Sequence, residues 1–483
     1  MNIAKRRKLF RPFLVTAAFC VIAALAGCPH PPRGVLKEAK LLIEHNATDE
    51  DTGFQAFADG EPWNNLSICG PHFRQILRVC AGGGLRDFGL TELFFETNEP
   101  ANADVPIDDV LARMPEGDYR FAAHTVGAPA SMGTALLTHA IPMGPEILTP
   151  GKVEKGLDPA NVFISWEAVS EDIHGGAATI VGYQVIVEED AEPEFPQGFY
   201  RPWMSIHVPA SVTEVNVPSE FLEDDACYKF EVLAIEESGN QTLSSGEFET
   251  GQGCAAKAVK GNGPPALTAA KLLIEHNATD EDTGFQGFGD GEPWNRLTIT
   301  GPDNQTIVTV TPKGSLFNFG LTELFFETNE PPNADVPIED VLARLPEGTY
   351  TFEAGHVNGA KSLLTADFSH TIPAGPVLVS PEDGDENVNP DAVVIEWEPV
   401  TSAIKGGQAI TIAGYQVIVE LDKKPRFPNA FAQPEFNIFM PGTATSVSVP
   451  AAFFESGKPY AYEVLAIEET GNQTLSAAEF RTK

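Results

Sequence analysis

Hydrophobic and polar residues alternate along most of the chain in short runs that turn-forming residues separate. Runs such as 161–169, 182–188 and 228–236 alternate at every second position and are bounded by Gly, Pro, Asn or Ser. Strands with one buried face give this period of two, whereas amphipathic helices give a period near 3.6. The pattern therefore predicts an all-β chain with a short helix at 106–114, which starts with Pro and is stopped by Pro-Glu-Gly.

The segment 37–144 shows the same strand pattern around that helix. Six short strands are expected in it, at 40–47, 66–69, 75–80, 91–97, 119–123 and 136–141. The second and third of these have the spacing of a hairpin. We interpret the segment as an Ig-like β-sandwich with one short helix.

One long unit occurs twice in the chain. Residues 40–55 recur unchanged at 271–286, an offset of 231 that becomes 232 after one inserted residue near Ala409. Segment 251–267 joins the copies and has the Gly, Ala and Pro content of a linker. Because the unit is longer than a typical all-β module, each copy is expected to contain two domains.

The second half of each unit resembles a fibronectin type III domain. Trp166 matches the core Trp of strand B, Tyr183 lies in the predicted strand C, and Tyr228 lies where the family has its tyrosine corner. The second copy has the same residue types at Trp397, Tyr415 and Tyr460. The resemblance implies a β-sandwich of about 100 residues in each copy.

The first 28 residues resemble a bacterial lipoprotein signal. A basic stretch precedes the apolar run 13–25, and Leu25-Ala26-Gly27-Cys28 resembles a lipobox. The apolar run is short enough for a cleaved secretory signal, because a membrane-spanning helix needs about 20 residues. The resemblance implies cleavage before Cys28, a lipid on its thiol and attachment to the cell envelope, and Pro29 in place of Asp implies the outer membrane.

These observations give the predicted organisation of the chain. The fold class is all-β, with four tandem β-sandwich modules in which Ig-like and fibronectin type III modules alternate. The predicted boundaries are 1–27 for the signal peptide, 28–36 for the tether, 37–144 and 268–375 for the Ig-like modules, 145–250 and 376–483 for the type III modules, and 251–267 for the linker.

The chain is strongly acidic. Its formal net charge is −37, and without the predicted signal peptide 26 basic residues face 68 acidic ones, a net charge of −42. A surface this negative repels phosphate groups, so no nucleic-acid partner is expected. Cations and neutral polymers remain candidate ligands.

Two acidic loops are the candidate metal sites. Asp49 and Asp51, repeated as Asp280 and Asp282, stand two positions apart beside a Gly that suits a tight turn. Such carboxylates are the ligands that Ca²⁺ prefers, so calcium is the one candidate cofactor, bound weakly because two carboxylates leave the ion mostly hydrated. The alternative is a solvated turn capped by Asp side chains.

Cys227 and Cys254 are expected to form a disulfide in the oxidising environment of a secreted protein. A turn at 239–240 pairs positions whose numbers sum to 479, and the numbers of these two cysteines sum to 481. Cys69 and Cys80 match their predicted hairpin less closely, so their pairing is left open.

The chain has no nucleophile elbow, P-loop or dinucleotide-binding motif, so we expect no catalysis. The expected function is that of a membrane-anchored, surface-displayed adhesion or scaffold protein, which binds an extracellular protein or glycan. One alternative is a polysaccharide-binding accessory lipoprotein that depends on calcium, suggested by the acidic loops and by the loop aromatics Tyr200 and Trp203. Another is a hydrolase with its site at a module interface, since acidic pairs are frequent.

Overall fold

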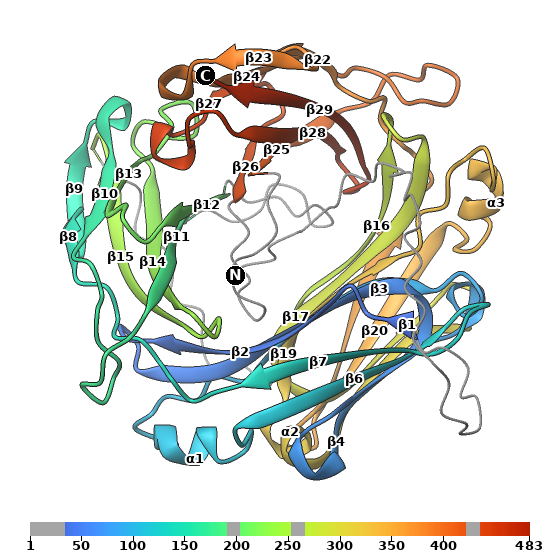
Figure 1. The fold of residues 1–483 in the computed structure, drawn as a ribbon. Coiled ribbons are helices and arrows are strands. Elements are labelled where there is room, and N and C mark those ends of the chain that lie inside the picture. Colours follow the sequence, from blue (N-terminus) through green and yellow to red (C-terminus); the bar gives the residue numbers. More distant parts are fainter. Residues whose placement is uncertain (1–33, 191–202, 253–265, 422–434) are drawn as a thin grey trace, which may run out of the picture.

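A computed structural model describes residues 34–190, 203–252, 266–421 and 435–483 (Figure 1). Strands make up nearly all of its regular structure, so the all-β prediction is confirmed. In these ranges no helix combines the length and the hydrophobicity that crossing a membrane requires.

Strands and a helix form the first segment near the places that its pattern predicts. They are β1 Gly34–Val35, β2 Glu38–Asn46, β3 Asp51–Cys69, β4 Gln75–Ala81, β5 Leu90–Thr97, α1 Ile107–Leu111, β6 Gly117–Thr125 and β7 Ser131–Leu137. The exceptions are that β3 also covers 51–65 and that the strand predicted at 136–141 lies at 131–137. The long strand β3 serves two sheets: its first part pairs with β2 and β5, and its second part pairs with β4 and β6. The register shifts between Asp59 and Trp63, where the strand passes from one sheet to the other.

The second segment forms the two-layered sandwich that the fibronectin type III resemblance implies. Its strands are β8 Ile147–Thr149, β9 Val153–Leu157, β10 Phe163–Trp166, β11 Ile180–Glu189, β12 Trp203–Pro209, β13 Glu214–Asn216, β14 Cys227–Glu236 and β15 Gln241–Thr250. Trp166 is buried, with its ring centroid 5.2 Å from that of Tyr183. The Tyr228 hydroxyl accepts a hydrogen bond of 2.7 Å from the Glu223 N–H, as a tyrosine corner requires.

The second copy repeats both segments. Its Ig-like segment contains β16 Leu267–Asn277, β17 Asp282–Thr300, β18 Thr306–Pro312, α2 Gly314–Phe319, β19 Leu321–Thr328, α3 Ile338–Leu342, β20 Gly348–His356 and β21 Lys361–Phe368. Its type III segment contains β22 Val377–Ser380, β23 Asp385–Val388, β24 Val394–Glu398, β25 Ile412–Leu421, β26 Glu435–Pro441, β27 Ser446–Ser448, β28 Pro459–Glu468 and β29 Gln473–Thr482.

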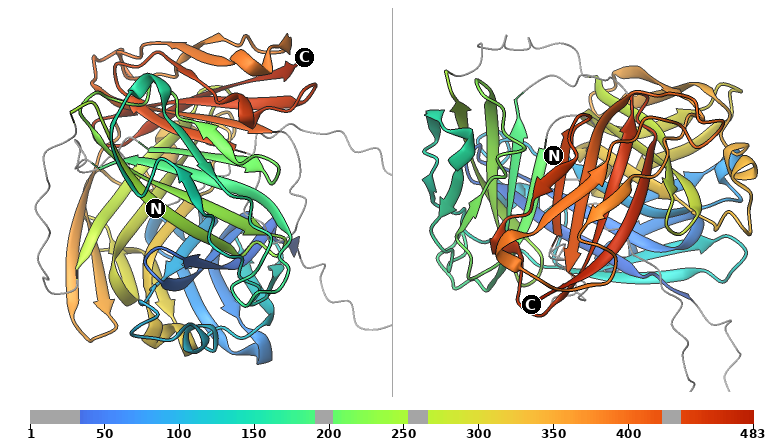
Figure 2. Two further views of the ribbon diagram at one scale, coloured as in Figure 1. Left: turned by 90° about the vertical axis from the view of Figure 1, so that its left-hand side faces the viewer. Right: turned by 90° about the horizontal axis from the view of Figure 1, so that it is seen from above.

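The four segments do not form a string. Their inner sheets pair edge to edge into a closed ring in the order β2, β3, β5, β19, β17, β16, β29, β28, β25, β26, β12, β11, β14, β15 and back to β2. Figures 1 and 2 show the two Ig-like segments side by side along one arc and the two type III segments along the other. The predicted boundaries therefore divide the sequence into segments, but one continuous sheet contains strands of all four segments.

The four segments meet at four strand pairings, here called joins. Two of the joins pair a strand with its own repeat. β5 runs antiparallel to β19, with Phe94 opposite Phe325, and β12 runs antiparallel to β26, with Ser205 opposite Asn437. The other two joins, β2 with β15 and β16 with β29, are parallel and connect an Ig-like segment to the type III segment of its own copy. The ring therefore has an approximate twofold symmetry.

At each parallel join a buried Asn makes hydrogen bonds between the two segments. Asn240 is 1% exposed; its side-chain oxygen accepts from the Ile43 N–H at 2.8 Å, and its amide donates to the carbonyls of Thr138 and Ala140. In the second copy Asn472 makes the equivalent bonds to Ile274, Ser369 and Thr371. Asn240 and Asn472 both belong to the sequence GNQTL, which the two copies share.

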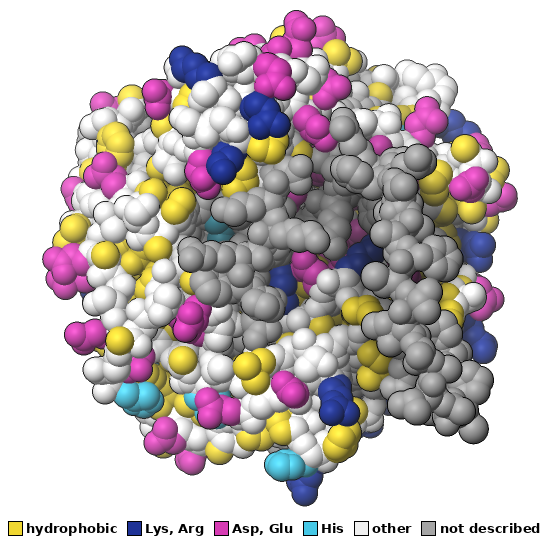
Figure 3. Space-filling view, in the orientation of Figure 1, with side chains coloured by type: hydrophobic (Ala, Val, Ile, Leu, Met, Phe, Trp, Pro, Cys, Tyr) yellow, Lys and Arg dark blue, Asp and Glu magenta, His cyan; other side chains and the backbone are white. Residues whose placement is uncertain are grey.

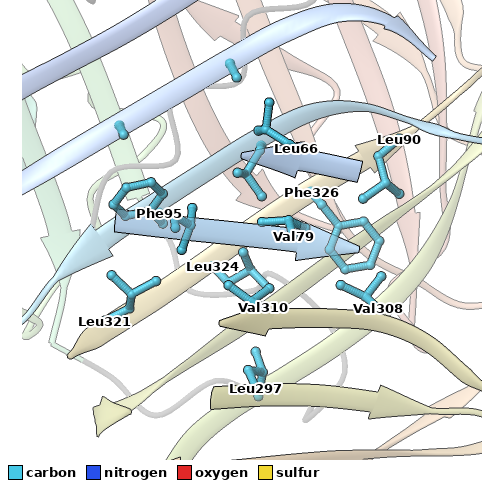
Figure 4. Packing of buried hydrophobic residues seen from close by; sticks show 14 of the residues in the cluster. Leu66, Val79, Leu90, Phe95, Leu297, Val308, Val310, Leu321, Leu324 and Phe326 are labelled. Carbon is cyan, nitrogen blue, oxygen red and sulfur yellow. The ribbon is translucent and has the colours of Figure 1, made fainter. Parts of the chain in front are cut away.

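The two Ig-like segments share one hydrophobic core (Figure 4). Side chains of both copies interdigitate in it, as Leu66, Val79, Leu90 and Phe95 do with Leu297, Val308, Val310, Leu321, Leu324 and Phe326. The aromatic contacts are reciprocal, because Phe319 lies 6.2 Å from Phe54, and the matching residues Phe88 and Phe285 lie 6.0 Å apart. The hydrophobic cores of the two Ig-like segments are therefore continuous with each other.

Closure of the ring at β12 and β26 can be tested by a cross-link. Directly opposed residues of antiparallel strands have Cα atoms about 4.5 to 5.5 Å apart, within the range that a disulfide bridges. The double variant Ser205→Cys with Asn437→Cys should therefore form an intrachain disulfide under mild oxidation, detected by non-reducing peptide mapping. The control, Ser205→Cys with Ser446→Cys, should not, because Ser446 pairs with β24. A folded double variant that stays reduced would show that the ring is open at this join.

Candidate functional site

The inner face of the ring carries two acidic rows on either side of a phenylalanine row. Alternation along β5 and β19 puts every second side chain on this face, and the cross-strand pairs are Glu96 with Glu323, Phe94 with Phe325 and Glu92 with Glu327. Phe57 and Phe288 extend the phenylalanine row, and Lys40 and Lys271 lie over their rings. The acidic rows stand four residues apart along each strand, about 13 Å at 3.3 Å per residue.

Further carboxylates join each acidic row where an Ig-like segment meets a type III segment. The first acidic cluster consists of Glu44, Asp51, Glu96, Glu99, Glu231, Asp290 and Glu323, which act electrostatically on one another. The second acidic cluster contains the repeats of these residues, namely Glu275, Asp282, Glu327, Glu330, Glu463, Asp59 and Glu92. Each cluster therefore combines residues of both copies.

A pocket of about 280 Å³ opens at the second acidic cluster. Its acidic lining residues are Asp59, Glu61, Glu92, Glu275, Asp280, Asp282, Glu327, Glu330 and Glu463. The basic residue of the lining is Lys37, whose ammonium lies 3.6 Å from Asp59. Acidic side chains are also more frequent than basic ones on the face of the ring shown in Figure 3. The pocket therefore carries a large excess of negative charge.

Amide side chains connect the carboxylates within each cluster. Gln286 donates to Glu275 at 2.7 Å and to Glu327 at 2.9 Å, and Gln473 also donates to Glu275. In the first acidic cluster Gln55 donates to Glu96 at 3.2 Å, and Gln241 donates to Glu44. These amides hold the carboxylates in place, and the bonds from Gln241 and Gln55 partly offset the effect of burial on the pKa of Glu44 and Glu96.

Burial and mutual repulsion make the first acidic cluster hold protons tightly. Burial, together with the charges of Glu96 and Glu231, raises the pKa of Glu44 to about 8, and burial raises the pKa of Glu96 to about 7. The same two causes raise the pKa of Glu99 and of Glu323 well above the ordinary range. The cluster is therefore a site that favours protons or other positive charge.

Glu323 is the most isolated of these carboxylates. Its side chain is 1% exposed, and neither carboxylate oxygen has a hydrogen-bond donor among the described residues. In the register of the sheet it lies between Glu96 and Asp290. A buried carboxylate in this position lacks the donors that such groups normally have.

The acidic loops fold as turns, but the turn residue differs from the one predicted. Asn46 accepts from the backbone N–H of Asp49 at 2.9 Å, and its amide donates to the Asp49 carboxylate at 3.1 Å. Glu50 has the left-handed φ of 55°, whereas Gly53, expected to close the turn, lies in β3. A Cβ on Gly53 would come 2.6 Å from Cγ of Glu99, so the glycine makes room for this carboxylate instead.

The four predicted calcium ligands do not form one kind of site. Asp51 belongs to the first acidic cluster, where burial and the charge of Asp49 raise its pKa to about 6. Asp280 and Asp282 line the pocket. Among the described residues no group of three or more His, Cys, Asp or Glu side chains is arranged to hold a metal. Calcium binding stays a prediction.

The predicted disulfide is described at one of its two residues. Cys227 is disulfide-bonded, and Cys254 lies outside the described residues, as does Cys28. Cys69 and Cys80 are free thiols; the register places Cys69 opposite Gln75, and Cys80 opposite Asn65.

The loop aromatics that suggested glycan binding lie differently from what was expected. Trp203 is 8% exposed and begins β12, with its ring 5.8 Å from that of Phe439 in an edge-to-face contact. Tyr200 lies outside the described residues. Trp203 thus packs within the ring, so the described part of this pair gives no support to a sugar-stacking surface.

Sequence reasoning missed most members of the acidic clusters. The alternation Glu92, Phe94, Glu96 and its repeat in β19 were readable as one strand face. The pairing of β5 with β19 and the approach of Glu231 from β14 depend on contacts between distant segments, for which the sequence gives no local signal.

No family model matches the chain, and no curated protein matches it. Among solved structures it is similar to a tetra-tandem repeat from the extending region of a large adhesion protein, with 12% identity over 92% of this chain and 99% of that one, at a TM-score of 0.16. It is also similar to fibronectin(III)-like modules of Clostridium thermocellum CbhA, with 10% identity over 44% of this chain and 94% of that one, at a TM-score of 0.19.

The raised pKa values predict that stability falls as the pH rises. The folded state binds the protons of Glu44 and Glu96 more tightly than the unfolded state, so their contribution is complete near pH 4.5 and is lost as the pH passes about 7 to 8. The free energy of unfolding should thus be lower at pH 9 than at pH 5.5 by at least about 1 kcal/mol, measured by denaturant titration. Glu44→Gln should reduce this difference, and Glu396→Gln, on an exposed part of β24, should not. Equal pH dependence in the three proteins would contradict the assignment.

Proposed function

We propose that this chain is a lipid-anchored, surface-displayed binding or scaffold protein without catalytic activity, whose ligand site is the inner face of the ring. The observation that supports this proposal is the ring closure itself. It brings carboxylates of four segments into two clusters beside a pocket, and a binding protein uses such convergent polar groups for specificity. The partner is an extracellular molecule, and the lipid on Cys28 keeps the ring at the cell envelope.

The symmetry of the ring also favours binding. Two related clusters in one rigid frame can engage one ligand twice, and the second contact is then intramolecular. A string of separate modules would achieve this only through its linkers. The ring fixes the two clusters at one distance and thereby selects ligands of matching length.

Capture from the native cell surface tests this function. The immobilised full chain should retain its partner, and Glu44→Gln with Glu275→Gln, one substitution in each acidic cluster, should weaken retention severalfold. The control variant Glu396→Gln with Glu398→Gln removes the same charge from the exposed face of β24 and should behave like the wild type. Equal retention by all three proteins would place the binding site outside the acidic clusters.

A hydrolase remains the second candidate, because the pocket lies between segments and is lined by carboxylates. Glu327 lines this pocket, and its repeat Glu96 in the first acidic cluster has a pKa of about 7, in the range that suits a general acid at neutral pH. A broad hydrolase screen would favour this function only if wild-type turnover were lost in Glu96→Gln and Glu327→Gln and kept in the control variant.

Lipid attachment at Cys28 is a separate prediction. Intact-mass analysis of the protein from a membrane fraction should show the loss of residues 1–27 and the addition of a diacylglycerol. Cys28→Ala should leave the protein in the aqueous phase of a detergent partition. A variant that still enters the detergent phase completely would show that another anchor holds the protein.

A further inference from the structure

We propose that the ligand of the acidic clusters is an organic polyamine, a flexible chain that carries several ammonium groups. This inference rests on the proposed function and names the class of ligand for the same site. It follows from the hydrogen-bonding needs of the buried carboxylates, from the charge of the pocket and from the distance between the clusters.

Two carboxylates of the first acidic cluster have buried oxygens without a hydrogen-bond donor among the described residues. Both oxygens of Glu323 and one oxygen of Asp51 are buried without a donor among the described residues, and both side chains belong to the first acidic cluster. An unsatisfied buried acceptor is costly, and more so when it is charged. A primary ammonium group offers three donors and a positive charge, and so meets both needs at once.

The pocket at the second acidic cluster requires the same chemistry. Nine acidic residues and one Lys line it, so its formal charge is strongly negative. A lining of one predominant sign attracts ligands of the opposite charge. A ligand that brings several positive charges therefore matches the acidic lining of this pocket.

The spread of the carboxylates favours a polyamine over a metal ion. Ca²⁺ needs six to eight oxygens around one point, and no group of three or more suitable side chains is arranged in that way among the described residues. The acidic rows instead lie about 13 Å apart along the strands, with Phe94 and Phe325 between them. Ammonium groups separated by methylene chains match charged rows on either side of an apolar row.

Isothermal titration of the full chain with spermine, at pH 8 and low salt, tests the inference. Spermine should bind the wild type, and Glu96→Gln with Glu323→Gln should weaken its affinity at least tenfold. Both substitutions preserve side-chain size and remove repulsion between opposed carboxylates, so this variant should melt at or above the wild-type temperature, which shows that it is folded. The matched control, Glu396→Gln with Glu398→Gln, should bind spermine as the wild type does.

Other outcomes overturn the inference. Equal weakening in the control variant would show general attraction to an acidic surface. Calcium binding that Glu96→Gln with Glu323→Gln abolishes, without spermine binding, would make the cluster a metal site. Binding of an oligolysine peptide without spermine binding would make the ligand a basic polypeptide. In each case the capture experiment remains a separate test, because a ligand of another class can still depend on the acidic clusters.

Discussion

The antiparallel pairing of β5 with its own repeat β19 is the contact on which the rest of the molecule depends. A strand edge with unpaired N–H and C=O groups invites another strand, and a duplicated unit supplies a second edge that fits by symmetry. The same contact lets Phe88 and Phe319 enter the core of the opposite copy. With β12 and β26 paired as well, the four segments close into a ring whose inner sheet has no free edge.

This pairing destabilises the sheet at two positions, and we interpret this loss of stability as a sign of function. It places Glu96 opposite Glu323 and Glu92 opposite Glu327, although like charges directly opposite each other destabilise a sheet. A neutral pair would hold the two copies together better. Folds tend to break such local rules at functional sites, and the stability lost here leaves carboxylates that attract positive charge. Burial and the charge of Glu96 across the pair raise the pKa of Glu323 well above its ordinary range.

The sequence predicted those features of the fold that depend on residues close together in the chain. Strand alternation located β2, β5, β11 and β14, proline placed α1, and the resemblance implied the tyrosine corner at Tyr228. The turn of the acidic loop was assigned to Gly53, although Glu50 adopts the left-handed conformation, because a glycine is only a statistical marker of such turns. The ring and its clusters were not foreseen, since they require register between strands roughly 200 residues or more apart, and a repeat says nothing about whether its copies pair.

The two acidic clusters are repeats of each other, but they differ in the group that contacts one matched Asp. In the second cluster Lys37 stands 3.6 Å from Asp59, whereas at the matching position of the first cluster Thr268 donates a hydroxyl hydrogen bond of 2.6 Å to Asp290. A hydroxyl satisfies an oxygen without neutralising it, so Asp290 keeps its charge. Glu323 lies beside Asp290 in the register, and burial together with the charges of Glu96 and Asp290 raises its pKa well above the ordinary range. Duplication has therefore given the ring two acidic clusters of one chemical type, in which one matched Asp is contacted by an ammonium group in one cluster and by a hydroxyl in the other.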